Sequence, residues 1–216
     1  MDFLIWVRGP GFVIAVALFL FGVVLRLLEI YGLGRKPDLS EPRASGMVAG
    51  VRTIFTRSIA HAVFNSRTAV TYISGYIFHI GLFVIIFMLI PHIEIFRKVL
   101  GISWPGLPSS LVDFIAVITM ISLLVVLVDR FMNPVKRQLT VIGDHVAWLL
   151  TFAPILTGYM SFHHLLLPYQ QMLGVHILCA ELLLALLPFT KLAHSFTTFI
   201  SRWYNGAMAG RKGVVS

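Results

Sequence analysis

Cysteine and charge are both scarce in this chain, and each scarcity narrows what the protein can be. The one cysteine, Cys179, lies inside an apolar run. A single thiol excludes an internal disulfide, an iron–sulfur cluster held by cysteines of this chain, and covalent haem attachment through a C-x-x-C-H motif. Only 12% of the 216 residues are charged and 58% are hydrophobic, which excludes an ordinary soluble domain.

Long apolar runs take up most of the chain. Five are long enough to cross a bilayer as helices, with approximate bounds of 10–33, 69–92, 110–129, 141–166 and 171–195. We therefore expect an all-α integral membrane bundle of five transmembrane helices, with residues 1–216 forming a single domain. The spans leave no soluble segment able to bury a catalytic core, so difficult chemistry would take place on another chain.

The basic residues are distributed unevenly between the two sides of this five-span arrangement. Thirteen of the 17 fall on one side: Arg35, Lys36, Arg43, Arg52, Arg57, Arg67, Arg130, Lys136, Arg137, Lys191, Arg202, Arg211 and Lys212. Because cytoplasmic connections are enriched in lysine and arginine, we expect the N-terminus outside and the C-terminus in the cytoplasm. Topology and attraction to anionic headgroups explain the net charge of +8, so no nucleic-acid partner is expected.

Two histidines occur in the last apolar run, MLGVHILCAELLLALLPFTKLAH. His176 and His194 are eighteen residues apart, which on one continuous helix is five turns, or about 27 Å along one face. Histidine inside a membrane usually faces other protein for a functional reason. The spacing suggests axial ligands for two stacked haems, which would be b-type; the other interpretation is a pair of hydrogen-bonded interfacial histidines.

The second apolar run, GYIFHIGLFVIIFMLIPH, carries His79 near its middle and His92 at its end. Gly75 and Gly81 flank His79, and small residues there would admit either a flat macrocycle or a close-packed helix. His92 would face about 140° away from His79 on an ideal helix. It would therefore need a bend at Pro91 to share a haem stack, which makes it the weaker ligand.

Residues 43–64 mix apolar and basic side chains in a stretch too polar to span a membrane. We expect this stretch to lie along the cytoplasmic interface, either as a surface anchor or as a docking surface for a soluble partner. His61 within it is expected to be interfacial rather than a metal ligand.

Several motifs resemble one known family over nearly the whole chain. They are VVLRLLE with Arg26, FHIG with His79, the basic turn DRFMNPVKRQLTVIGDH, and HILCAELLLALLPFTKLAH. With these motifs the chain resembles the gamma, or cytochrome b, subunit of respiratory nitrate reductases and its relatives in heterodisulfide-reductase-like and sulfur-metabolising membrane complexes. The resemblance implies a five-helix bundle, with its N-terminus outside, that holds two bis-histidine haems b between the second and fifth helices.

The resemblance also implies ligands. His79 and His194 match the ligands of the inner haem, and His176 matches one ligand of the outer haem. The family's other second-helix histidine falls at Leu89 here, so the fourth ligand is left between His92 and the alternatives His163 and His164. His79 is expected near mid-membrane and His194 near the inner boundary, which makes His145 a fallback inner ligand.

A bis-histidine haem has no open iron position and transfers single electrons. The expected function is therefore that of a membrane cytochrome b subunit, not catalytic alone, which passes electrons between the quinone pool and a cytoplasmic iron–sulfur oxidoreductase partner. The expected location is a bacterial or archaeal cytoplasmic membrane. A haem-free membrane anchor or assembly subunit is the alternative, and a transporter is less favoured because no internal repeat is visible.

Quinone exchange is expected on the outer side, beside the haem served by His176. Tyr169 and Gln170, in the turn LLLPYQQM, could donate hydrogen bonds to a quinone carbonyl, although a Pro-Tyr pair at an interface also serves as a headgroup anchor. Glu181, one and a half turns inward of His176, is a candidate for proton transfer or cofactor hydrogen bonding. Its alternative role is a helix-to-helix hydrogen bond.

Overall fold

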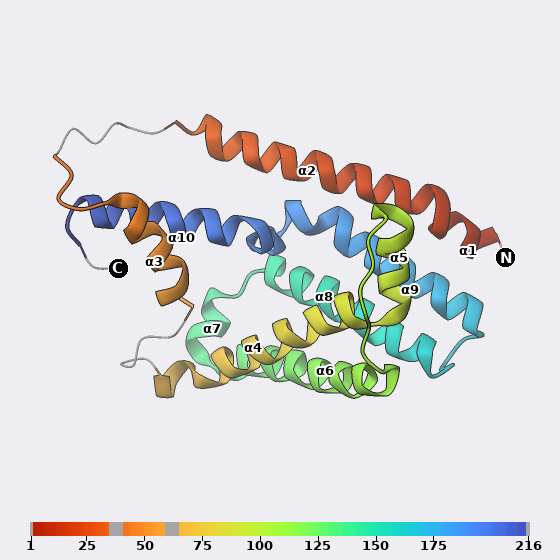
Figure 1. The fold of residues 1–216 in the computed structure, drawn as a ribbon. Helices are drawn as coiled ribbons and strands as arrows, with labels where there is room; N and C mark the ends of the chain where they lie inside the picture. The colour runs from red at the N-terminus through yellow and green to blue at the C-terminus, as the bar shows by residue number, and fades with distance from the viewer. Residues whose placement is uncertain (1, 35–40, 59–64, 215–216) are drawn as a thin grey trace. The chain divides into compact units, whose positions relative to one another are not determined.

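The protein is all-helical in the part of the chain that the computed structural model describes, which is residues 2–34, 41–58 and 65–214. Helix accounts for 84% of the structure and no strand occurs among these residues. The elements in chain order are α1 (Asp2–Trp6), the π-helical η1 (Val7–Gly11), α2 (Phe12–Gly32), α3 (Gly46–Thr56), α4 (Asn65–Met88), α5 (Ile90–Leu100), α6 (Ser109–Met132), α7 (Pro134–Leu139), α8 (Ile142–Phe162), α9 (Tyr169–Leu186), η3 (Leu187–Phe189), η4 (Lys191–Ala193) and α10 (His194–Arg211). Figure 1 shows this order.

Five helical stretches are long and apolar enough to cross a membrane, which confirms the number expected. They are Asp2–Gly32, Thr68–Met88, Ser109–Met132, Ile142–Phe162 and Tyr169–Phe189. At most 28% of the most apolar window in any of them is buried within the protein, so most of their apolar surface needs lipid or another chain to cover it. These helices indicate a multi-pass membrane protein; the orientation of its termini stays a prediction.

The chain divides into two compact units. The first unit comprises residues 1–15 and 67–184, and the second comprises residues 16–66 and 185–216. The expectation of a single domain over residues 1–216 stays a prediction.

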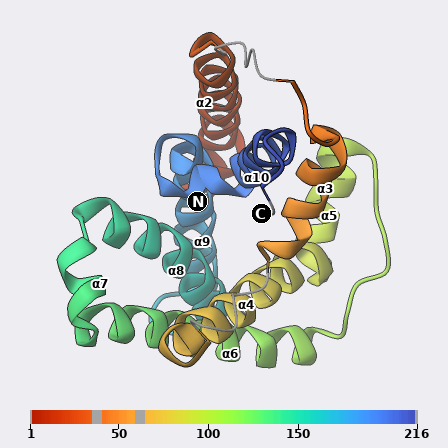
Figure 2. The same cartoon turned by 90° about the vertical axis from the view of Figure 1, so that its left-hand side faces the viewer.

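The first unit has its core between α6 and α8, which the short helix α7 connects (Figure 2). Leu123 and Ile155 are buried there, and the indole of Trp148 donates to the carbonyl of Leu123 at 2.9 Å. Helix α4 approaches α6 closely: a Cβ added to Gly81 would come within 1.9 Å of Thr119 Oγ1. Gly81 therefore serves helix packing, which is the second of the two roles considered for it.

The expected second span, 69–92, is interrupted before its end. Helix α4 stops at Met88, Leu89 is extended (φ −78°, ψ 124°), and α5 begins at Ile90. Pro91 explains the break because it lacks the N–H that a continuous helix would donate to Phe87. The indole of Trp104 donates to that carbonyl instead, at 2.5 Å, and the amide of Leu107 donates to the carbonyl of Met88 at 2.9 Å. His79 and His92 thus lie on different helices.

The expectation of one continuous helix over 171–195 is wrong. Helix α9 ends at Leu186, two single 3₁₀ turns follow, and α10 begins at His194. Pro188 lacks the N–H needed to continue the α-helical ladder, and Thr190 between the turns is extended (φ −115°, ψ −178°). His176 and His194 therefore do not share one helix, and the five-turn spacing calculated for them does not apply.

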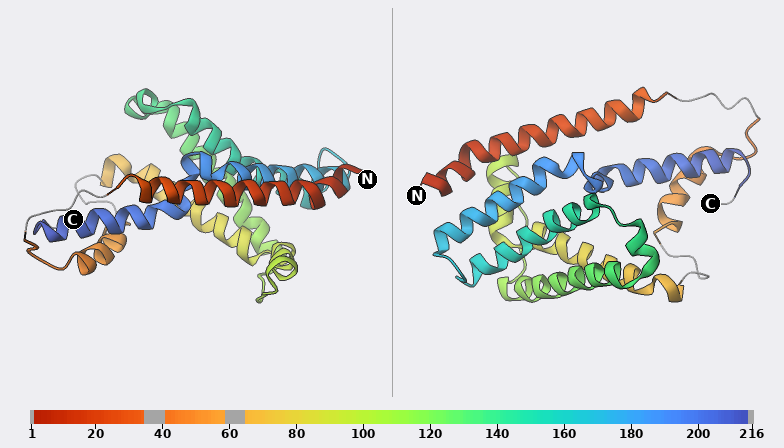
Figure 3. Two further views of the ribbon diagram at one scale, coloured as in Figure 1. Left: turned by 90° about the horizontal axis from the view of Figure 1, so that it is seen from above. Right: turned by 180° about the vertical axis from the view of Figure 1, so that it is seen from behind.

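In the second unit α3 packs along α10 (Figure 3). Glycines permit the close approach: a Cβ added to Gly206 would lie 2.2 Å from Thr53 Oγ1, and one added to Gly210 would lie 2.2 Å from the Cβ of Ala49. Arg202 donates to the hydroxyl of Ser58 at 2.8 Å beyond the end of α3. The expected interfacial segment 43–64 is thus a helix in its middle, whereas His61 lies outside the described residues.

The same unit contains Arg26, one of the residues that carry the family resemblance. Its Nε donates to the carbonyl of Pro188 at 3.0 Å, and its Nη1 forms an ion pair with Glu29 at 2.8 Å. Gly22 lies one turn earlier on α2, where an added Cβ would come within 2.7 Å of both Pro188 and Phe189. Arg26 and Gly22 therefore bring α2 against the 3₁₀ turn that interrupts the last apolar run.

Candidate functional site

Two histidines from separate helices meet in the first unit. The ring centres of His92, on α5, and His176, on α9, are 6.1 Å apart, and their planes differ by 15°. Of the candidates in this unit, His92 is the histidine whose ring lies beside that of His176 in the described residues. The structure thus brings His92 beside His176, and the identity of the fourth ligand stays a prediction.

The helix break positions His92. A helix leaves the carbonyls of its last turn without intrahelical partners, and His92 Nδ1 donates to one of them, that of Ile85, at 2.8 Å. A carbonyl can only accept, so the proton lies on Nδ1 and the lone pair on Nε2. Burial lowers the pKa of His92 below its ordinary value of 6.5, although the hydrogen bond to Ile85 acts in the opposite direction. The neutral imidazole that a metal requires is therefore favoured.

Helix α8 positions His176. Nδ1 of His176 donates to the carbonyl of Pro154 at 2.9 Å, which again leaves the lone pair on Nε2. Gly158, one turn along α8, makes room for the ring: an added Cβ would lie 3.0 Å from His176 Cε1 and 3.1 Å from Nδ1. Pro154 and Gly158 thus fix the tautomer and the position of the imidazole.

The separation of the His92 and His176 rings can be compared with that of two axial ligands of one haem. Such a haem is held by two imidazoles on opposite sides of one iron. With metal–nitrogen bonds of about 2.0 Å and about 1.1 Å from nitrogen to ring centre, the two ring centres would lie about 6 Å apart. The observed 6.1 Å agrees with this separation. A backbone carbonyl that orients each Nδ1–H is also the usual outer partner of a metal-binding histidine.

The two alternative ligands have other contacts. His163 Nε2 lies 2.9 Å from Asp113 Oδ1, so the nitrogen that a haem iron would use is engaged with a carboxylate. His164 adopts a left-handed backbone conformation (φ 53°), and its ring centre lies 5.1 Å from that of Tyr169. Tyr169 and Gln170 are both exposed at the start of α9.

The expected inner ligands fall in different units. His79, on α4, donates from Nδ1 to the carbonyl of Gly75 at 2.7 Å, and a Cβ added to Gly75 would meet nothing within 4 Å. His194, in the second unit, donates from Nδ1 to the carbonyl of Lys191 at 2.8 Å. Both imidazoles therefore have the tautomer seen at His92 and His176, and their pairing stays a prediction. The fallback ligand His145 stacks on Phe131 at 5.4 Å between ring centres.

Glu181 is buried against the N-terminal helix, with 7% of its surface exposed. A Cβ added to Gly11, the last residue of the π-helical turn η1, would lie 2.9 Å from Glu181 Oε2 and 3.0 Å from the Trp6 ring. Oε1 has no hydrogen-bond partner among the described residues. The helix-to-helix hydrogen bond considered as the alternative role of Glu181 is thus not seen there.

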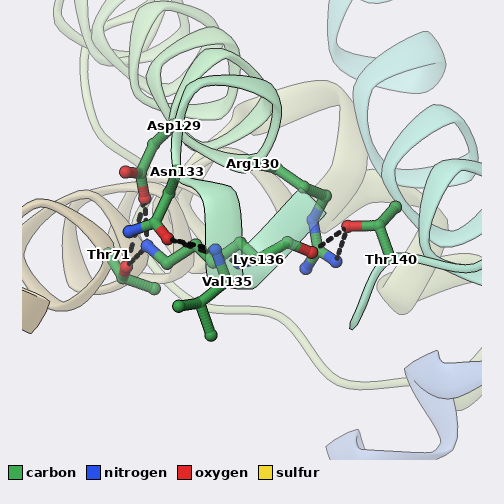
Figure 4. A network of polar contacts seen from close by, with 7 residues as sticks. All are labelled: Thr71, Asp129, Arg130, Asn133, Val135, Lys136 and Thr140. Atoms are coloured by element: carbon green, nitrogen blue, oxygen red, sulfur yellow. Dashed lines mark hydrogen bonds and ion pairs between the residues drawn. The ribbon is translucent and has the colours of Figure 1, made fainter. Parts of the chain in front are cut away.

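The basic turn expected on the cytoplasmic side forms a polar network within the first unit (Figure 4). The ammonium of Lys136 contacts Asp129 Oδ2 and the hydroxyl of Thr71. Arg130 forms an ion pair with Asp144 at 3.3 Å. These pairs join α4, α6, α7 and α8 at one end of the unit.

Sequence reasoning missed two residues that position His176, which are Pro154 and Gly158, and it missed Asp113, which contacts His163. The signals were weak, because a proline and a glycine four residues apart in an apolar helix indicate close packing without indicating what packs there. Asp113 stands in the fifth position of α6, where a carboxylate near a helix start has the ordinary role of favourable interaction with the helix dipole.

The described residues contain no group of three or more His, Cys, Asp or Glu side chains placed to hold a metal ion. The His92 and His176 pair is a two-ligand arrangement. No family model matches the chain, and no solved structure matches it. A protein of Nitratidesulfovibrio vulgaris strain Hildenborough, named only "Protein", is 28% identical over 202 residues, which cover 91% of this chain and 89% of that relative.

Proposed function

We propose that this chain is a membrane cytochrome b subunit that passes electrons between the quinone pool and an iron–sulfur-containing cytoplasmic oxidoreductase partner. The observation that carries the proposal is the His92 and His176 pair. Its ring separation of 6.1 Å and its two carbonyl-oriented Nδ1 atoms suit two axial ligands of one haem b.

The chain's own residues would hold and orient this group. Ile85 and Pro154 fix the tautomers through their carbonyls, and Gly158 leaves room for the His176 ring. The haem, when bound, supplies one-electron redox chemistry and, with both axial positions taken by imidazole, no oxygen binding. The protein's contribution is to keep the two imidazoles in place and correctly oriented.

A second haem between His79 and His194 belongs to the same proposal. It is supported by the family resemblance and by the tautomer that both imidazoles share with the other pair. Under the topology that the basic residues favour, this haem lies on the cytoplasmic side, where a soluble iron–sulfur partner would exchange electrons. The bacterial source of the relative agrees with a bacterial or archaeal cytoplasmic membrane.

Quinone would exchange at the outer end of the first unit. Tyr169 and Gln170 are exposed there at the start of α9 and carry side-chain hydrogen-bond donors. Quinol oxidised on that side would release its protons outward while its electrons moved inward, so turnover would be electrogenic.

The proposal is tested by haem content and spectra of the purified chain. A reduced-minus-oxidised spectrum should show b-type bands with two haems per polypeptide, and His176→Ala should retain one. Glu94→Gln, in the exposed ion pair with Arg97 on α5, is the control, because Glu94 is not among the candidate ligands; it should retain both haems. A wild-type chain without b-type bands would instead support the haem-free anchor, and two haems in His176→Ala would overturn the ligand assignment.

A further inference from the structure

A histidine and an aspartate meet at the junction between α6 and α8. His163 follows the last residue of α8 and Asp113 lies in the second turn of α6. Nε2 of His163 and Oδ1 of Asp113 are 2.9 Å apart, and the two side chains are 35% and 25% exposed. The imidazole is also held by the ring of Tyr159, at 4.3 Å between centres, and by that of Phe162, at 5.1 Å.

This contact determines which nitrogen of His163 can accept a proton. An ionised carboxylate only accepts hydrogen bonds, so Nε2 carries the hydrogen and Nδ1 keeps its lone pair. Nδ1 of His163 makes no hydrogen bond to any described residue. A carboxylate behind an imidazole orients the ring and leaves the other ring nitrogen as the acceptor.

The dyad lies at the same end of α8 as the candidate haem ligands. Gly158, which contacts His176, is five residues before His163, a rise of about 7.5 Å along a helix. The chain around the dyad is apolar and exposed: Phe162 is 52% exposed and Leu165 is 45% exposed. Such a surface suits a lipid-soluble reactant better than a water-soluble one.

We propose that His163 accepts a proton from quinol at this outer site and that Asp113 positions it; the inference rests on the proposed function. In the first step a quinol O–H bond breaks, its proton moves to Nδ1 of His163, and one electron leaves to the one-electron acceptor that His92 and His176 would hold. The second O–H gives its proton to water, and the second electron follows the first. One quinol thus yields one quinone, two protons and two electrons.

The test uses the full-length chain in proteoliposomes with menadiol, a naphthoquinol, as the reductant, and follows the rate of haem reduction by stopped-flow absorbance. General bases of this kind contribute about 10²-fold or more to rate, so His163→Gln should slow reduction by menadiol at least tenfold, while haem content and reduction by dithionite stay at wild-type levels. Asp113→Asn should slow it as well, and Asp113→Glu should restore much of the rate. Glu94→Gln, in the exposed pair with Arg97 on α5, is the control and should change nothing.

The outcomes separate this inference from the function on which it rests. If the wild-type chain binds no haem, the proposed function itself is contradicted. Wild-type reduction rates in both His163→Gln and Asp113→Asn, with haem content intact, would leave that function standing and overturn the dyad. If His163→Gln loses its haem or fails to fold, Asp113→Asn becomes the deciding variant, because it keeps the imidazole. If menadiol then reduces the haem of Asp113→Asn as fast as that of Asp113→Glu, the proposal is contradicted.

Discussion

The imidazole of His92 donates from Nδ1 to the carbonyl of Ile85, seven residues earlier, at 2.8 Å. This hydrogen bond connects the end of α4 with the candidate haem site. The break at Leu89 leaves carbonyls of the last α4 turn without intrahelical partners, and His92, Trp104 and Leu107 satisfy three of them. Replacing His92 would remove a hydrogen bond at the end of α4 as well as a candidate ligand. His176 is therefore the better position at which to test ligation.

Gly158→Ala should displace the His176 ring while leaving both imidazoles in the sequence. The new Cβ would lie 3.0 Å from Cε1 and 3.1 Å from Nδ1 of His176, closer than ordinary contact. The ring would have to move away from α8, which weakens its hydrogen bond to the Pro154 carbonyl. Because such orienting bonds change metal affinity by about 10-fold to 100-fold, we expect lower occupancy of the outer haem, measured as haem per polypeptide and by redox titration.

Gly32→Ala is the matched control for this substitution, because a Cβ added to Gly32 meets nothing within 4 Å. It should leave both haems in place. Full outer-haem occupancy with an unchanged potential in Gly158→Ala would mean that the His176 ring does not lie against α8 as described.

Gly81→Ala should destabilise the contact between α4 and α6. A Cβ there would come within 1.9 Å of Thr119 Oγ1, and neither helix can accommodate that contact without shifting. Overpacking of this kind costs about 1–3 kcal/mol, so the midpoint of thermal unfolding in detergent should fall. The double variant Gly81→Ala/Thr119→Ala should recover part of the loss, since the clashing hydroxyl is gone. Simple additivity of the two single changes would show that Gly81 and Thr119 are not in contact.

The sequence predicted the number of membrane-spanning helices because long apolar runs are local and additive signals. It did not predict where two of those runs break. Pro91 was recognised as a bend, but Pro188 lies in an equally apolar run, and the 3₁₀ turns around it depend on Thr190 and on packing against Gly22. A helix end that depends on both a proline and tertiary contacts is difficult to predict from an apolar sequence.

The residue types of the candidate site could be predicted from the sequence, but the pairing of its side chains could be predicted only in part. His176 and His92 were recognised as candidates, but their proximity depends on how Leu89 turns α5 away from α4. The Asp113 and His163 pair was not predicted, because its members lie fifty residues apart on two helices and no periodicity connects them. Pairing across helices is a tertiary property, and one sequence carries no direct record of it.

The topology gives a prediction that does not depend on any cofactor. Thirteen of the 17 basic residues lie on one side under the five-span arrangement, and that side should be cytoplasmic. A reporter active only in the cytoplasm should therefore be active when fused after Ser216, and one active only after export should be active when fused before Met1. Cytoplasmic activity at both ends would require an even number of spans and would contradict the five helices.

Glu181→Gln tests whether the buried carboxyl of α9 takes part in proton transfer. Glutamine keeps the size and hydrogen-bonding ability of glutamate and removes its acid–base chemistry. The carboxyl lies against Gly11 with Oε1 unpartnered among the described residues, so no interaction seen there needs the acid, and the unfolding midpoint should change little. An ionisable side chain at membrane depth is a functional candidate by default, and we expect a several-fold slower reduction of the haems by menadiol at unchanged haem content. Glu29→Gln, in the exposed pair with Arg26, is the control. A wild-type rate in Glu181→Gln would assign the carboxyl to packing against the π-helical turn alone.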